Sequence, residues 1–296
     1  MPRTLLSLSL AGLMAVTTGT WAADTAERLA VLDFGALDII AALDQRQRVA
    51  GLAKQGLPEH LGAFADEAYR DLGSLVDVDM ARLASIEPDT IVISGRLSDS
   101  REALQAIAPV VQTGAKSPDD YWAGLSTEVT TLGQRLGLDA EADTALRELR
   151  EDLDASIAGL TQEAEVLVVL HNDGNLVYQE HALVNGLMGL ASPTLPADVE
   201  HVTRGERTFT ALTVEQIANM SPDLVWIIDR SAAIGQDGLD LDAFTAGLGA
   251  DSTLRVAKGS PRLWYLAGLG IDSTRLKVQE VIQALDPALN QPSNQG

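Results

Sequence analysis

A short pattern that occurs twice constrains the fold of this chain more than any other feature. Residues 84–96 read ASIEPDTIVISGR and residues 218–230 read ANMSPDLVWIIDR, so both copies follow A-x-x-x-P-D-x-[IV]-x-I-x-x-R. Each copy predicts a helix that ends before Pro-Asp, then a buried strand of β-branched and aromatic residues, and then a loop that begins near an arginine. Because all matched positions share one offset of domain size, we interpret the copies as a duplicated structural unit.

Signals for strands and helices alternate around both copies of the repeat. Further strands are expected at residues 29–33, 48–52, 166–170 and 263–266. Helical patterns separate these strands, and alternation of this kind is typical of parallel sheets. The sequence therefore predicts an α/β protein of two lobes, each with a central, mostly parallel sheet flanked by helices.

A long amphipathic helix is predicted between the two halves of the chain. Apolar residues recur there every three or four positions, at Leu146, Leu149, Leu153, Ile157 and Leu160. This spacing predicts a single stiff backbone helix over residues 139–161 that joins an N-terminal lobe at 23–138 to a C-terminal lobe at 162–290. Residues 291–296 have the composition of a flexible tail.

The first residues have the organisation of a secretory signal peptide over residues 1–22. Arg3 precedes an apolar run from Leu5 to Val16, and small residues at Thr20 and Ala22 fit a cleavage site. The apolar run is shorter than the roughly 20 residues that span a bilayer. The chain contains no cysteine, which excludes disulfides, thiolate metal sites and a lipidated cysteine anchor. We therefore expect a freely diffusing periplasmic protein with no membrane span after cleavage.

Arg96 and Arg230 close the two copies of the repeat and are the first candidates for a binding site. In open α/β sheets, ligands bind in the crevice beyond the carboxyl ends of the strands, where both arginines fall. A lone arginine is usually part of a surface ion pair, but a repeated pair favours a ligand. The guanidinium group stays charged, and its planar fork matches carboxylate, catecholate or hydroxamate oxygens. The sequence thus predicts an anionic ligand in a cleft between the lobes.

Composition and missing motifs argue against other functions. The formal net charge of −21 argues against a nucleic-acid partner. The patterns G-x-S-x-G, P-loop and H-E-x-x-H are absent, and no cysteine nucleophile exists. We therefore expect a binding protein and keep a periplasmic enzyme only as a remote alternative.

Several segments, taken together, carry a family pattern over essentially the whole mature chain. They are IVISGRLSDSREALQAIAPVVQTG (91–114), DYWAGLSTEVTTLGQRLG (120–137), LHNDGN (170–175), DLVWIIDRSAAIG (223–235) and LWYLAGLGIDSTRLKVQEV (263–281). These segments resemble the periplasmic ferric-siderophore receptors of bacterial ABC importers, particularly those for catecholate siderophores. The resemblance implies two α/β lobes joined by one long helix. It also implies a monomer without a covalent cofactor that binds an Fe(III)–siderophore complex and delivers it to an inner-membrane ABC permease.

The resemblance also assigns roles to individual residues. Arg96 and Arg230 resemble the ligand-binding arginines of the family, and Tyr265 resembles a tyrosine that approaches the iron. Tyrosinate is a hard oxygen donor suited to ferric iron, so Tyr265 is the candidate metal contact. Heme remains an alternative cargo because a tyrosine at the cleft also suits it, and cobalamin or another metal chelate remains open because the architecture serves these ligands too.

Two further segments extend the candidate site. In YQEHALVNGLMG (178–189), the family would place an arginine and then a metal-liganding histidine, and here His181 and Asn185 take these positions. Asparagine is a poor ferric ligand, which favours an iron wrapped entirely by its chelator. Arg204, in TRGERTF, adds positive charge near the rim of the second lobe, either for the ligand or for pairing with neighbouring acids.

Overall fold

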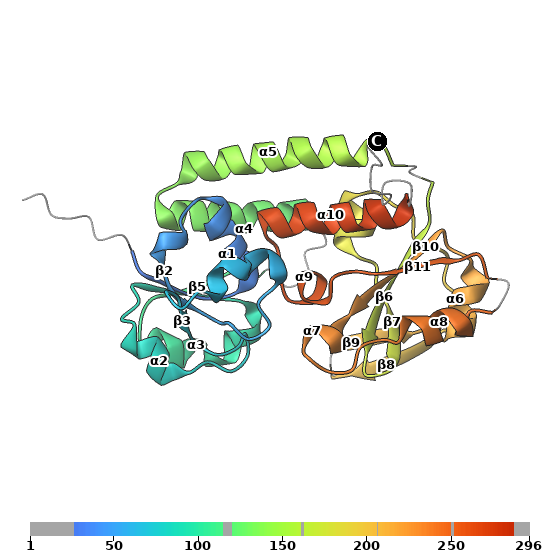
Figure 1. Ribbon diagram of the computed structural model, residues 1–296, viewed down its shortest axis with the longest axis horizontal. Coiled ribbons are helices and arrows are strands. Elements are labelled where there is room, and N and C mark those ends of the chain that lie inside the picture. The colour runs from blue at the N-terminus through green and yellow to red at the C-terminus, as the bar shows by residue number, and fades with distance from the viewer. Residues whose placement is uncertain (1–26, 115–119, 161–162, 206, 250–251, 287–296) are drawn as a thin grey trace, which may run out of the picture.

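The structure is a computed structural model that describes residues 27–114, 120–160, 163–205, 207–249 and 252–286 (Figure 1). It consists of two α/β lobes side by side, each built on its own sheet, with long helices along one side of both (Figure 1). The two-lobed α/β prediction is therefore confirmed. The predicted signal peptide and the predicted tail lie outside the described residues.

The N-terminal lobe contains a five-stranded sheet in the order β3-β2-β1-β4-β5, with every pair of neighbours parallel. Its strands are β1 (Leu29–Leu32), β2 (Val49–Leu52), β3 (Arg70–Asp71), β4 (Thr90–Ile93) and β5 (Val110–Gln112). Its helices are α1 (Phe34–Ala42), α2 (Met80–Ser85) and α3 (Arg101–Gln105), with 3-10 helices at Arg46–Arg48, Glu59–Ala65 and Gly95–Ser100. The central strands β1 and β4 are buried throughout, as their continuous apolar runs predict.

The C-terminal lobe contains a six-stranded mixed sheet in the order β11-β10-β6-β7-β9-β8. Its strands are β6 (Val166–Asn172), β7 (Asn175–Tyr178), β8 (Glu200–Arg204), β9 (Arg207–Ala211), β10 (Leu224–Asp229) and β11 (Arg255–Lys258). Its helices are a π-helix (Ala182–Leu187), α6 (Val214–Met220), α7 (Arg230–Ala233), α8 (Leu241–Gly247), α9 (Pro261–Tyr265) and α10 (Ile271–Leu285).

The second sheet is mixed: the predicted, mostly parallel arrangement holds for its inner half and not for its outer half. β11, β10 and β6 are parallel, whereas β7, β9 and β8 pair antiparallel. The change of direction comes from the tight turn at Asp173 and Gly174, which both have positive φ, at 51° and 74°. Such a turn closes a hairpin between β6 and β7 and requires glycine or a tolerant residue such as aspartate.

The two copies of the repeat fold as equivalent units. In the first copy, α2 leads into β4, and Asp89 Oδ2 accepts a hydrogen bond of 2.8 Å from the backbone N–H of Arg28, just before β1. In the second copy, α6 leads into β10, and Asp223 Oδ2 accepts a 2.9 Å bond from the N–H of Glu165, just before β6. The shared pattern of contacts confirms helix, turn and strand in both copies, and β4 pairs with β1 as β10 pairs with β6.

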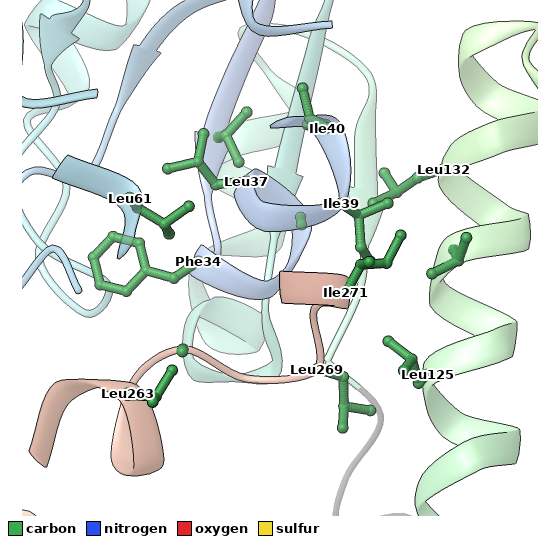
Figure 2. Packing of buried hydrophobic residues seen from close by; sticks show 14 of the residues in the cluster. Phe34, Leu37, Ile39, Ile40, Leu61, Leu125, Leu132, Leu263, Leu269 and Ile271 are labelled. Atoms are coloured by element: carbon green, nitrogen blue, oxygen red, sulfur yellow. The ribbon is translucent and has the colours of Figure 1, made fainter. Parts of the chain in front are cut away.

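The predicted connecting helix is observed as α5 (Asp139–Ile157), which runs along both lobes (Figure 1). It packs against α4 (Tyr121–Leu136) and α10, so the connection is a helical layer of several elements. Below this layer the hydrophobic core is continuous between lobes. Figure 2 shows residues of the C-terminal segment, including Leu263, Leu269 and Ile271, among core residues of α1 and α4.

Residues 263–266 do not form the strand that their apolar run predicts, because α9 covers Pro261–Tyr265. Proline is well suited to the first turn of a helix, where no N–H partner is needed, and Pro261 takes that position. A short apolar run is compatible with either element, so the preceding Ser-Pro pair is the better indicator.

Candidate ligand-binding site

Arg96 and Arg230 each lie in a helical turn that directly follows a buried central strand. In the second copy Asp229 ends β10 and accepts a 3.1 Å hydrogen bond from the N–H of Ala232, which caps α7. In the first copy Ser94 follows β4, and its Oγ accepts a 3.3 Å bond from the N–H of Arg96. In each copy, the side chain of a residue one or two positions before the arginine caps the helical turn that carries it.

Both arginines contact Tyr265, although they belong to different lobes. Arg96 Nη2 donates to the backbone oxygen of Tyr265 at 3.0 Å, and Arg230 Nε donates to the Tyr265 hydroxyl oxygen at 2.8 Å. The guanidinium carbons lie 5.6 Å (Arg96) and 5.4 Å (Arg230) from the centroid of the tyrosine ring, within the range of cation–π attraction. The structure thus brings together three of the residues that the sequence proposes for one site.

These residues line a cavity of about 430 Å³ between the lobes. Two further features of its wall were not predicted: a third arginine, Arg262, and a series of apolar side chains. None of the described residues that line the cavity is acidic. The complete lining is Gln55, Gly56, Ser74, Leu75, Val76, Arg96, Arg230, Ala233, Ile234, Gly235, Arg262, Tyr265 and Leu266. The cavity therefore concentrates positive charge in a chain whose net charge is −21.

Among the described contacts, Arg230 forms no ion pair with the neighbouring Asp229, because other groups bind that carboxylate. Asp229 is fully buried and receives hydrogen bonds from His171 Nδ1 (2.9 Å) and from the N–H of Leu239 (2.8 Å), with Lys258 Nζ at 3.4 Å. Burial opposes ionisation, but these hydrogen bonds outweigh it and hold the pKa of Asp229 below its ordinary value. Lys258 thus supplies the counter-charge that Arg230 would otherwise provide.

His181 and Asn185 are placed away from the arginines and do not line the cavity. Asn185 Oδ1 accepts a 2.9 Å bond from the N–H of His181, and its Nδ2 donates to the oxygen of Leu190 at 3.1 Å. The amide therefore stabilises the π-helix and the segment after it. The His181 ring lies 5.4 Å from the Trp264 ring, and burial, with the nearby charge of Lys277, lowers the pKa of His181 to about 4.

His181 and Asn185 are half-buried, and these contacts tie them to their own lobe, so we leave them out of the candidate site. Arg204 ends β8, the edge strand of the second sheet, which β6, β7 and β9 separate from β10. The Arg204 side chain lies outside the described part of the structure, so a role of Arg204 at the ligand stays a prediction.

The cavity-lining residues that were not predicted include Arg262, Val76 and Ile234. Of these, Arg262 has the clearest signal in the sequence. It lies three positions before Tyr265 in α9, and residues three apart share a face of a helix. Reading Pro261 as the start of a helix would have placed Arg262 beside Tyr265. Val76 and Ile234 carry no comparable signal, because single exposed apolar residues are common on protein surfaces.

Two α/β lobes under a common helical layer, with a cation-lined cavity between them, define a solute-binding protein. The profile of the periplasmic binding protein family matches residues 29–250, and the chain belongs to this family. Within the described residues, no helix has both the length and the apolar character needed to cross a membrane.

Individual relatives agree with this assignment. The petrobactin-binding protein YclQ of Bacillus subtilis is 29% identical over 283 residues, which cover 90% of this chain and 85% of YclQ. The crystal structure of YclQ matches with a TM-score of 0.76 at 26% identity, over 88% of this chain and 92% of that one. The ferric-anguibactin-binding protein FatB of Vibrio anguillarum is 23% identical over 279 residues, which cover 87% of this chain and 82% of FatB.

The periplasmic catecholate-siderophore binding protein VctP of Vibrio cholerae has the same fold. Its structure matches with a TM-score of 0.72 and 21% identity, over 87% of this chain and 93% of that chain.

Proposed function

We propose that this protein captures an anionic ferric siderophore of the catecholate type in the cavity between its lobes and delivers it to an inner-membrane ABC permease. The observation that carries the proposal is the convergence of Arg96 and Arg230, from two different lobes, on Tyr265. YclQ, 29% identical, is named a petrobactin-binding protein, and FatB, 23% identical, is named a ferric-anguibactin-binding protein, which supports an iron chelate as the cargo.

The charge of the cavity fits such a cargo. A ferric tris-catecholate complex is a compact polyanion, and arginine forks pair well with its oxygens. At physiological salt, charges are strongly screened beyond about 8 Å. The arginines at the cavity therefore govern the potential that a bound anion experiences, while the distant acidic surface contributes little.

In this proposal the protein binds its cargo without changing it. The siderophore surrounds the iron, and Arg96, Arg230 and Arg262 hold the organic shell. Tyr265 lines the same cavity, and its hydroxyl oxygen accepts a hydrogen bond from Arg230 Nε. The protein then acts in the periplasm as a monomer without a covalent cofactor or a catalytic step.

Titration of the purified protein with a ferric catecholate siderophore, hemin and cyanocobalamin tests the proposal. Trp264 is buried next to Tyr265, so quenching of its fluorescence reports binding. We expect tight binding of the ferric siderophore and weak or absent binding of nearly neutral cyanocobalamin. A Soret band in protein purified from its own host, together with hemin binding tighter than siderophore binding, would overturn the proposal in favour of heme.

A further inference from the structure

Two exposed apolar side chains lie at the cavity that the proposed function uses. Among the described residues, Val76 and Ile234 are the large apolar residues that remain exposed, at 68% and 39% of their surface. Each one alone would need no explanation. Both, however, line the same cavity, Val76 from the N-terminal lobe and Ile234 from the C-terminal lobe. An apolar surface that water contacts on both sides of a binding cavity indicates a ligand with an apolar part.

The backbone holds both side chains in place. Val76 lies in a tight turn in which Ser74 Oγ accepts hydrogen bonds from the N–H groups of Val76 (3.3 Å) and Asp77 (2.9 Å). Ile234 follows α7, and its N–H donates to the oxygen of Arg230 at 3.1 Å. Ordered backbones lower the entropy that is lost when a ligand binds. The exposed side chains are therefore presented by fixed segments.

The apolar surface continues from these two residues into the cavity. Leu266 lines the cavity, and its Cδ1 would lie 3.0 Å from a Cβ atom placed on Gly56. Gly56 has a φ of +79°, so both its conformation and its lack of a side chain permit this approach between the lobes. The cavity thus combines an apolar wall with the arginines and the Tyr265 hydroxyl.

We propose that Val76 and Ile234 form an apolar lip that contacts the hydrocarbon linker of the siderophore and makes the protein prefer linkers of this type. This inference rests on the proposed function. The arginines bind any ferric chelate of suitable negative charge, so they do not distinguish one linker from another. Removing a methylene group from water contributes about a fourfold gain in affinity, so a few buried methylenes are enough for selection.

Two synthetic hexadentate tris-catechol chelators, loaded with Fe(III), test this preference. One carries alkyl linkers and the other carries oligoether linkers of the same length, so that the two complexes have equal charge. Dissociation constants come from quenching of tryptophan fluorescence for the wild type, V76T/I234T and V76L/I234L. We expect the wild type to prefer the alkyl complex about tenfold, which corresponds to the burial of one to two methylenes.

In V76T/I234T we expect the preference to fall below about twofold, through weaker binding of the alkyl complex alone, while V76L/I234L retains it. Equal binding of both complexes by the wild type would overturn the proposed preference and leave the proposed function intact. Equal weakening of both complexes in V76T/I234T would do the same. Full preference for the alkyl complex in V76T/I234T would also overturn the proposal, because Val76 and Ile234 would then have no part in the selection. Failure of the wild type to bind either complex would count against the proposed function itself.

Discussion

Arg230 Nε donates a 2.8 Å hydrogen bond to the hydroxyl oxygen of Tyr265, and this bond connects the end of the second repeat copy to a helix outside it. Arg96, the matching residue of the first copy, donates to the backbone oxygen of the same tyrosine. Tyr265 therefore contacts the last residue of both copies. Because both guanidinium groups are positioned before a ligand arrives, less side-chain entropy is lost on binding.

Removal of the two repeated arginines should weaken binding strongly. A charged hydrogen bond contributes on the order of 1.5 kcal/mol, so R96A/R230A should lower the affinity for a ferric siderophore about 100-fold, and each single variant about tenfold. Fluorescence titration measures the change. Arg147→Ala is the matched control, because Arg147 forms a surface pair with Glu151 on α5 and does not line the cavity. If R96A/R230A bound the ferric siderophore as tightly as R147A does, Arg96 and Arg230 would not be ligand-binding residues.

Replacement of the Tyr265 hydroxyl should have a smaller effect. Tyr265→Phe retains the ring near both guanidinium groups but leaves Arg230 Nε without its acceptor, so affinity should fall about tenfold. The charge-transfer band of the bound complex should keep its position, because the chelator supplies the iron ligands. Tyr178→Phe is the control, because Tyr178 lies on β7 and its hydroxyl contacts Ser192. Unchanged affinity in Y265F would contradict the assignment, and a displaced band would make the tyrosine an iron ligand.

The junction of α1 and α10 should be a main determinant of stability. Asp38 in α1 is buried, and its carboxylate accepts hydrogen bonds from the N–H groups of Asp272 (2.9 Å) and Ser273 (2.7 Å) at the start of α10. Asp38→Ala leaves both donors without this acceptor, so the free energy of unfolding should fall by about 3 kcal/mol.

Urea denaturation measures this change. Asp240→Ala removes the same kind of cap from the exposed start of α8, where Asp240 accepts from the N–H of Ala243, and should cost only about 1 kcal/mol. If the two substitutions reduced the unfolding free energy equally, burial of the Asp38 cap would have no special effect.

His181 should make the protein less stable as the pH falls. Burial lowers the pKa of His181 from 6.5 to about 4, so between these values the unfolded chain binds a proton that the folded chain excludes. The unfolding free energy should therefore decrease as the pH falls from 6.5 towards 4, by about 3 kcal/mol from this residue. Urea titrations at several pH values should show a smaller slope in His181→Phe, which does not titrate. His201→Phe, on the exposed face of β8, should keep the wild-type slope. Equal slopes in all three proteins would refute the role of His181.

Several elements follow directly from the sequence because they depend on neighbours along the chain. The repeat predicts two strands that end near arginines, and β4 and β10 end there. The leucine spacing predicts α5. By contrast, the run at residues 263–266 is equally compatible with a strand and with the helix that forms, because four residues are too few to reveal a period.

The sequence by itself determined the duplicated units, the long helix and the pair of arginines, because periodicity and turn chemistry act between residues close in the chain. Only the tertiary structure decided which other side chains line the cavity between the lobes. Arg262, Val76 and Ile234 line the cavity, whereas His181 packs against Trp264. These positions depend on how the shared core and the helices α5 and α10 set one lobe against the other. Contacts between residues far apart in the chain determine that arrangement, and no local pattern encodes it.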